Sequence, residues 1–309
     1  MSDCQTENET RTKMDAASMI RTVKACIPPL DGSSHKGQAG RIGVVGGSLE
    51  YTGAPYFAGI SALRVGADLV HIFCTNPAST VIKSYSPELI VHPILDRPNA
   101  VSEISPWLDR LHAVVIGPGL GREAKTFEVV TELLKTIQTK NIPLVIDADG
   151  LFLITEKPDL LKEFTSPVIL TPNKIEFERL CNKFNGVSGL SRLGAKVTVF
   201  KKGQEDEVFS PIAEAQWKSS TGGSGRRCGG QGDLLSGAIA TFLHWTLASL
   251  NNIDTDSDKS MMAASLSCYA ASKLIRSCNE NGFKVKGRSM LAHDMIEYIH
   301  VSFEDLFGQ

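Results

Sequence analysis

A glycine-rich segment with an aspartate at its end is the part of the sequence best suited to phosphate chemistry. GGSGRRCGGQGDLLSG, residues 222–237, runs into an apolar helical pattern over 234–247. Backbone N–H groups in a glycine turn, backed by a helix N-terminus, form an anion site. Asp233, in the first turn, would then accept a proton from a hydroxyl that attacks a bound phosphoryl group. Aspartate is also a common helix cap, so these residues alone leave a purely structural role open.

Two other glycine turns follow apolar runs. In GRIGVVGGSLEYTGAP, residues 40–55, Gly46 and Gly47 allow close backbone approach to a ligand, and Tyr51 and Thr52 offer hydroxyls. The second turn is GPGLGR, residues 117–122, and it precedes a helical pattern. Neither has the G-x-G-x-x-G spacing of a dinucleotide fingerprint. Each is read either as a loop that contacts a ligand or as a plain turn.

Carboxylates follow two further apolar runs. Asp147 and Asp149 in DADG could coordinate Mg²⁺ through water, or simply form a turn. In TPNKIEFERL, Asn173 and Glu176 have the spacing of a capping box, which does not exclude a second role near Mg²⁺. The sequence therefore predicts several polar groups where strands end.

Apolar runs alternate with helical patterns from residue 41 to residue 200. Short runs such as HAVVIG and PLVIDA indicate strands buried on both faces, and alternation with helices indicates a parallel sheet with right-handed crossovers. We expect strands at 41–45, 69–74, 88–91, 113–116, 143–146, 168–170 and 196–200. We expect helices at 14–26, 56–65, 123–139 and 173–181, and again from 233 onward, with a surface loop at 251–259. These elements predict one α/β domain, residues 14–309, after a disordered polar leader, residues 1–13.

Composition excludes several classes of protein. The 309 residues are 42% hydrophobic and 21% charged with a formal net charge of -2, and no basic run suits nucleic acid. No apolar stretch approaches the roughly 20 residues of a membrane span. Seven cysteines without a CxxC motif favour reduced thiols over disulfides or zinc. A P-loop, a serine-hydrolase elbow and an HExxH motif are all missing, which leaves phosphoryl transfer at a site of another kind.

Together these motifs resemble a known family. An α/β chain that ends in a glycine-rich loop, Gly-x-Gly-Asp and a long helix resembles the ribokinase-like superfamily, which implies a three-layer α/β/α fold with a mostly parallel sheet. The ordered set KGQAGRIGVVGGSLEYTGAPYFAG, YSPELIVHP, VVIGPGLGR, VIDADGL, LTPNKIEFERL and RRCGGQGDLLSG is similar to the ATP-dependent NAD(P)H-hydrate dehydratases of the YjeF C-terminal type. The likeness spans residues 35–298.

This resemblance implies a lyase in nicotinamide nucleotide repair that proceeds through a kinase-like step. ATP would phosphorylate the C6 hydroxyl of the S form of hydrated NADH or NADPH. The phosphate would then leave, restoring NAD(P)H and releasing ADP and phosphate. ATP is thus a co-substrate and Mg²⁺ the expected cofactor, bridging the phosphates.

The resemblance also assigns site residues. Asp233 becomes the base at the C6 hydroxyl, with an anion hole formed by Gly230, Gln231 and Gly232. The hydrated nucleotide would contact Gly119, Asn173, Lys174, Ile175, Glu176, Phe177, Glu178 and Arg179 as well as Asp233. ATP would contact Lys202, Gly203, Gln204, Glu205, Asp206, Gly223, Ser224, Gly225, Arg226, Arg227, Cys228, Gly229, Gly230, Gln231 and Gly232.

Some local features depart from the family pattern. Lys174 stands where the family often has His, the stretch 181–195 looks short, and residues 290–293 replace a Thr-rich run. The alternatives are a ribokinase-like kinase of a small hydroxylated metabolite, such as a hydroxymethylpyrimidine or a hydroxyethylthiazole, and a nucleotide-binding protein without catalysis. We expect a cytoplasmic protein that acts on small molecules, with a mitochondrial form only from an alternative start, and we leave homo-oligomerisation open.

Overall fold

A computed structural model describes residues 14–32, 35–251 and 259–308, so the expected leader and most of the expected 251–259 loop lie outside it. The strands are β1 (Arg41–Val45), β2 (Leu69–Cys74), β3 (Ile90–Pro93), β4 (Ala113–Ile116), β5 (Leu144–Ile146), β6 (Val168–Leu170), β7 (Val197–Lys201), β8 (Asp206–Phe209) and β9 (Trp217–Ser219). The α-helices are α1 (Ala16–Cys26), α2 (Gly53–Val65), α3 (Asn76–Tyr85), α4 (Ala100–Leu108), α5 (Ala124–Thr139), α6 (Ala148–Glu156), α7 (Lys174–Lys183), α8 (Gln231–Asn251), α9 (Lys259–Lys286), α10 (Ala292–Ile296) and α11 (Ile299–Phe307).

All of these strands form one sheet in the order β3-β2-β1-β4-β5-β6-β7-β8-β9. Pairing is parallel from β3 to β7 and antiparallel for β8 and β9. The chain moves outward from β1 to β3 and then returns to place β4 on the other side of β1. The strand order reverses there, and ligands in such sheets bind beyond the carboxyl ends of the strands at that point.

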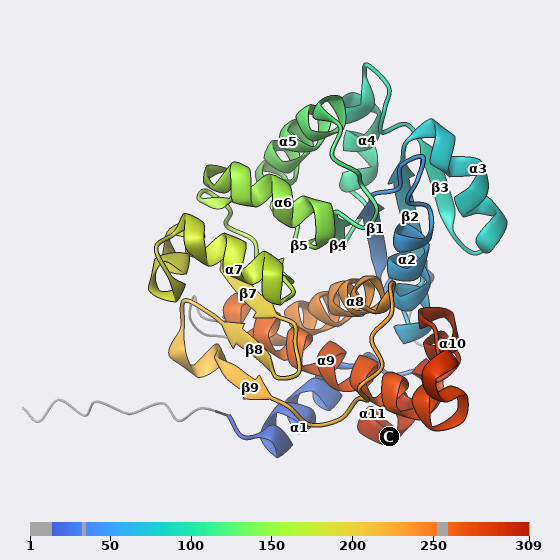
Figure 1. The fold of residues 1–309 in the computed structure, drawn as a ribbon, viewed down its shortest axis with the longest axis vertical. Helices are drawn as coiled ribbons and strands as arrows, with labels where there is room; N and C mark the ends of the chain where they lie inside the picture. The colour runs from blue at the N-terminus through green and yellow to red at the C-terminus, as the bar shows by residue number, and fades with distance from the viewer. Residues whose placement is uncertain (1–13, 33–34, 252–258, 309) are drawn as a thin grey trace, which may run out of the picture.

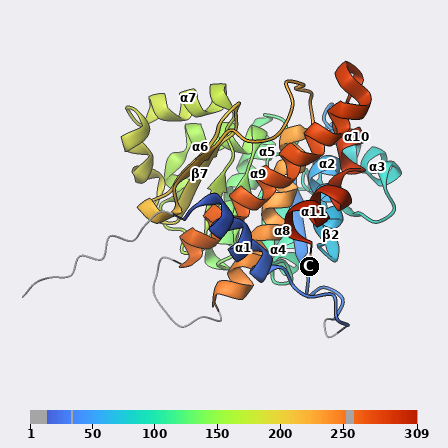
Figure 2. The ribbon, with the colours of Figure 1, turned by 90° about the horizontal axis from the view of Figure 1, so that it is seen from below.

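The central strands are covered on both faces, as their continuous apolar runs predict (Figures 1 and 2). Side chains alternate along β4: Ala113 and Val115 pack with α2, α8 and α9, whereas Val114 and Ile116 pack with α4 to α7. Two hydrophobic layers therefore flank the sheet, and the expected three-layer α/β/α fold is confirmed. Within the described ranges, no helix combines the length and the apolar character that a membrane span requires.

Close contact between α2 and α8 explains one glycine of the long helix. A Cβ atom built on Gly237 would lie 1.9 Å from the Ala58 carbonyl oxygen. Only a residue without a side chain lets the two helices approach to this distance. The same packing places the N-terminus of α8, with Asp233, at the carboxyl edge of the sheet near α2 (Figure 1).

Candidate active site

The two glycine turns meet where the strand order reverses. Gly47 N donates to the carbonyl oxygens of Pro118 and Gly119, each at 3.1 Å. A Cβ on Gly46 would lie 2.1 Å from the Pro118 oxygen, and one on Gly119 would lie 2.6 Å from the Tyr51 oxygen. The glycines therefore let the loops after β1 and β4 contact each other through their backbones.

Asp149 anchors the loop that carries Gly119. Its carboxylate accepts hydrogen bonds from Gly121 N at 3.1 Å and Arg122 Nε at 2.8 Å. The Arg122 guanidinium also lies 4.3 Å from the centre of the Phe152 ring. This carboxylate, one of two candidate Mg²⁺ ligands in the sequence, is thus bound to protein donors that fix the loop.

Asp147, the other candidate Mg²⁺ ligand, is 2% exposed. It pairs with Lys202, the residue that follows β7. Its Oδ1 atom lies 2.7 Å from Lys202 Nζ. Burial alone would lower the pKa of Lys202, but the negative charges of Asp147, Glu176 and Asp233 outweigh it and raise that pKa. Lys202 therefore remains an ammonium among three carboxyl groups. The sequence did not indicate this pairing, because the partners are 55 residues apart.

The capping box expected at the start of α7 is confirmed. Asn173 Oδ1 accepts from the backbone N–H groups of Ile175 and Glu176 at 3.0 Å, and Glu176 Oε2 accepts from Asn173 N at 2.9 Å. Burial raises the pKa of Glu176. Phe177 is buried and stacks on Phe209, so its side chain belongs to the core. The exposed residues of this segment are Asn173, Lys174, Ile175, Glu178 and Arg179.

Asp233 lies in the first turn of α8, as expected. Burial, followed by the negative charge of Asp147, raises its pKa to about 8, while Lys202 opposes the rise. Gly230 immediately precedes α8 and has φ of 92°, a backbone conformation that favours glycine. A Cβ there would lie 2.7 Å from Ala292 and 2.9 Å from the Phe57 ring. A strongly basic carboxylate at a helix N-terminus suits proton abstraction beside a bound anion.

The glycine-rich loop before α8 is held by a helix that the sequence motifs did not include. Asn279 of α9, 4% exposed, accepts from Ser224 N at 2.6 Å and from Ser224 Oγ at 2.7 Å, and its Nδ2 donates to Arg226 O at 3.2 Å. Gln231 Nε2 also donates to Arg226 O, at 3.3 Å. Side-chain amides thus hold the loop in one conformation. No local signal marks Asn279, which lies 55 residues after Ser224.

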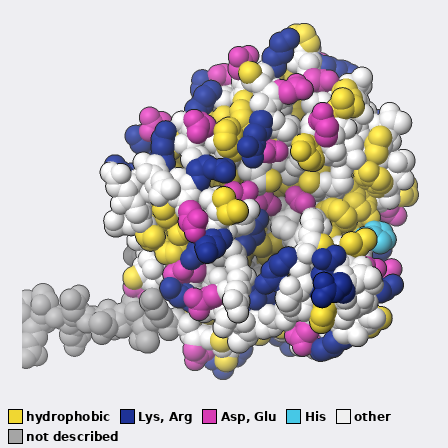
Figure 3. Space-filling model, in the orientation of Figure 1, with side chains coloured by type: hydrophobic (Ala, Val, Ile, Leu, Met, Phe, Trp, Pro, Cys, Tyr) yellow, Lys and Arg dark blue, Asp and Glu magenta, His cyan; other side chains and the backbone are white. Residues whose placement is uncertain are grey.

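The turn after β7 and the glycine-rich loop form one unit. Arg276 binds the carbonyl oxygens of Gly203 and Gln204 in the turn and of Gly222 in the loop, at 2.9, 3.1 and 3.1 Å. Buried Asp206, an expected ATP contact, is occupied by Arg276 and by the Ser272 hydroxyl. The space-filling view shows basic side chains gathered over this loop (Figure 3).

No group of three or more metal-ligating side chains occurs among the residues that the structure describes. The carboxylates of Asp147, Asp149 and Glu176 each already accept a hydrogen bond from a protein donor. This donor set does not build a protein cage for a cation. It fits a Mg²⁺ ion that arrives on phosphates and receives few protein ligands.

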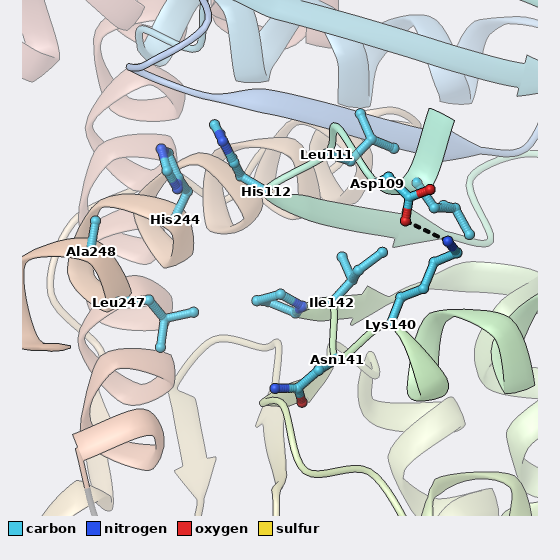
Figure 4. Close-up of a pocket in the computed structure, with 11 residues that line it drawn as sticks. Asp109, Leu111, His112, Lys140, Asn141, Ile142, His244, Leu247 and Ala248 are labelled. Carbon is cyan, nitrogen blue, oxygen red and sulfur yellow. Dashed lines mark hydrogen bonds and ion pairs between the residues drawn. The ribbon is translucent and has the colours of Figure 1, made fainter. Parts of the chain in front are cut away.

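A separate cavity of about 420 Å³ lies at the opposite edge of the sheet, before β4 and β5 (Figure 4). Stacked imidazoles of His112 and His244, 4.1 Å apart, line one side, and the Lys140–Asp109 ion pair lies on the other. The cavity contains none of the expected site residues. The site at the carboxyl edge is instead formed by loops and helix N-termini.

Comparison with known proteins agrees with this geometry. Residues 42–300 match the family model described as NAD(P)H-hydrate dehydratase. A protein of Aedes aegypti is 53% identical over 94% of this chain and 85% of its own, and one of Homo sapiens is 46% identical over 95% and 86%. Both are named ATP-dependent (S)-NAD(P)H-hydrate dehydratase.

Two solved structures share the fold at lower sequence identity. A ribokinase-like protein of Enterococcus faecalis has a TM-score of 0.74 and 20% identity, covering 94% of this chain and 95% of its own. The ADP/ATP-dependent NAD(P)H-hydrate dehydratase of Bacillus subtilis, co-crystallised with ATP/Mg²⁺, has a TM-score of 0.66 and 23% identity, covering 93% and 97%. These likenesses establish the ribokinase-like architecture of the chain.

Proposed function

The chain belongs to the NAD(P)H-hydrate dehydratase family, and from this premise we propose that it catalyses the ATP-dependent dehydration of (6S)-hydrated NADH and NADPH. The products are NAD(P)H, ADP and phosphate. The observation that carries the chemistry is Asp233, a carboxyl group with a pKa of about 8 in the first turn of α8. The names of the close relatives favour a dehydratase over a kinase of the same fold.

We assign the first step to a phosphoryl transfer. The substrate's C6 hydroxyl attacks the terminal phosphorus of ATP while Asp233 accepts the hydroxyl proton. We assign the anion hole for the transferred group to the backbone N–H groups of Gly230, Gln231 and Gly232, at the positive end of the α8 dipole. The phosphate then leaves C6 and the ring double bond returns, because a phosphate is a far better leaving group than a hydroxide.

We propose that ATP binds between the turn after β7 and the glycine-rich loop, the two segments that Arg276 joins. The hydrated nucleotide would bind against Gly119 and the exposed first turn of α7. Mg²⁺ would neutralise charge on the phosphates, and we propose the partly exposed carboxylate of Glu176, at the start of α7, as a protein contact for it. Free thiols on all six cysteines within the described ranges suit a reducing compartment, which supports a cytoplasmic location.

The test is a direct assay with hydrated NADH and ATP, following the near-ultraviolet absorbance of the reduced nicotinamide. We expect recovery of that absorbance that depends on both ATP and enzyme. A stable phosphorylated product without recovery would support a small-metabolite kinase. ATP binding without any turnover would support a nucleotide-binding protein instead. Either outcome would overturn the proposal.

A further inference from the structure

The Asp147–Lys202 ion pair is buried, and its carboxylate is held by two hydrogen bonds. Asp147 Oδ1 accepts from Lys202 Nζ at 2.7 Å and also from Ala148 N at 2.9 Å. The side chains of Asp147 and Lys202 are only 3% and 18% exposed. Such a pair costs desolvation free energy, so burial alone is no evidence that it stabilises the protein.

The backbone around Asp147 is fixed by close contacts. Ala148 has φ of 47°, a conformation that non-glycine residues rarely adopt. Gly150 N donates to the Asp147 carbonyl at 3.0 Å, and a Cβ on Gly117 would lie 1.8 Å from that same oxygen. Strained residues that the surroundings hold in place are concentrated at functional sites, which makes the Asp147 turn a candidate for one.

The pair lies against the first turn of α8. A Cβ on Gly232 would lie 3.1 Å from Lys202 Nζ and 3.8 Å from Asp147 Oδ2. The ammonium therefore occupies the space that the missing side chain of Gly232 leaves, one residue before Asp233. Three elements that are distant in sequence, the ends of β5 and β7 and the start of α8, meet at this point.

We propose that Asp147 is a positioning residue, whose carboxylate holds the Lys202 ammonium at the N-terminus of α8 to contact the phosphoryl group under transfer. This inference rests on the proposed function. It assigns to Asp147 a role other than metal ligation, because its carboxylate is already paired with the Lys202 ammonium.

The proton and charge balance of the step follows from these positions. The hydroxyl oxygen forms a bond to the terminal phosphorus, and the bond from that phosphorus to the bridging oxygen of ADP breaks. The hydroxyl proton goes to Asp233. Lys202 keeps its proton and offsets negative charge that develops on the phosphoryl and bridging oxygens. Asp147 transfers no proton and acts only by holding the ammonium in place.

A double-mutant cycle in the full chain tests this role, using Asp147→Asn, Lys202→Met and the double variant. If Asp147 acts through Lys202, Lys202→Met lowers kcat by roughly 10²-fold, Asp147→Asn by about 10-fold or more, and the double variant no further than Lys202→Met. Effects that multiply in the double variant would overturn the inference. If Asp147→Asn alone fails to fold, Lys202→Met is compared with the double variant, in which both charges are removed. Equal rates for these two variants would still support the inference. A slower double variant would contradict it.

The pH profile separates positioning from a structural role. Removing the charge of Asp147 lowers the pKa of Asp233, so the ascending limb of kcat/KM in Asp147→Asn should move to lower pH. A lower rate with an unmoved limb would indicate a structural role only. Asp109→Asn, which breaks the Lys140 ion pair at the opposite edge of the sheet, is the matched control and should retain the wild-type profile. Inactive wild-type enzyme would refute the proposed function, whereas active wild type with an additive cycle would refute this inference alone.

Discussion

Arg276 Nε lies 2.8 Å from Asp206 Oδ2, and the same guanidinium contacts both segments to which we assign ATP. Both side chains are largely buried. The other guanidinium N–H groups donate to backbone carbonyls of the turn after β7 and of the glycine-rich loop. A planar, multidentate cation can hold two loops in a fixed relation in a way that lysine cannot. The proposed nucleotide site is therefore held in place by a residue of α9 that lies outside every sequence motif.

Arg276→Met should weaken ATP binding more than it slows the chemical step. Losing the carbonyl contacts frees the turn and the loop, so ATP must order them on binding, whereas Asp233 and Lys202 keep their positions. We expect KM for ATP to rise about tenfold or more, with a smaller change in kcat. Steady-state kinetics at varied ATP concentration measure the two separately. A change confined to kcat would contradict the assigned role.

The sequence predicts the central strands well, because a strand that is buried on both faces appears in the sequence as a short continuous run of apolar residues. The expected bounds of β1, β2, β4 and β6 are confirmed. Strand β3 begins at Ile90 and not at Glu88, because the Glu88 carboxylate binds the Ser86 hydroxyl in the preceding turn. Strands β8 and β9 were not expected, since they are short, half-exposed and antiparallel.

The candidate site was predictable where its residues are close in sequence, and not where they come together from distant segments. The capping box at Asn173 and the placement of Asp233 follow from local spacing. Lys202, Asp147, Asn279 and Arg276 meet their partners only through the topology of the sheet and the course of α9. The short helix α6 was likewise missed, because its first residue, Ala148, has a backbone conformation that alanine rarely adopts.

Asp233→Asn should abolish turnover while ATP binding persists. The amide cannot accept the hydroxyl proton, yet it has nearly the same shape and leaves the loop contacts of Arg276 and Asn279 intact. Loss of a general base costs roughly 10² to 10⁴ in rate. The dehydratase assay measures the first expectation, and titration of ATP by calorimetry the second. Retention of more than a tenth of the wild-type rate would rule out Asp233 as the base.

The activity of the wild-type enzyme should rise with pH through about 8. Burial and the charge of Asp147 raise the pKa of Asp233 to about 8, so its carboxyl group is mostly protonated below that pH in the free enzyme. The base form that accepts the substrate proton therefore accumulates as the pH increases. The profile of kcat/KM reports the free enzyme and should show this ascending limb. The range to be measured is pH 6 to 9, whose upper end lies roughly one unit above the expected midpoint. A profile of kcat/KM that stays flat over this range would contradict the assignment of Asp233 as the base.

Gly237→Ala should destabilise the protein strongly. A methyl group there would overlap the Ala58 carbonyl at 1.9 Å and force α2 and α8 apart. Overpacking of this kind costs about 3 kcal/mol. Gly53→Ala is the matched control, because its Cβ would meet only the Phe57 ring, at 3.8 Å. Chemical denaturation of both variants measures the difference, and equal free energies of unfolding would show that the helices can adjust.

A buried histidine pair should make the fold sensitive to acid. His71 Nδ1 lies 3.0 Å from His92 Nε2, and His71 is 6% exposed. Burial, followed by the charges of His92, Arg110 and Arg41, lowers the pKa of His71 from 6.5 to about 4. The unfolded chain therefore binds more protons than the folded chain between these pH values. The stabilisation by neutral His71 is complete above pH 6.5 and is lost as the pH falls toward 4.

His71→Phe should flatten this dependence. Phenylalanine cannot take up a proton, so the part of the pH-dependent free energy that His71 supplies, at most about 3 kcal/mol, disappears. The slope of unfolding free energy against pH between 6.5 and 4 should then be smaller than in the wild type, whatever the absolute stability of the variant. His300→Phe, at an exposed position on α11, serves as the control and should leave the slope unchanged. Denaturation at a series of pH values gives these slopes directly, and equal slopes for wild type and His71→Phe would exclude His71 as the acid-sensitive group.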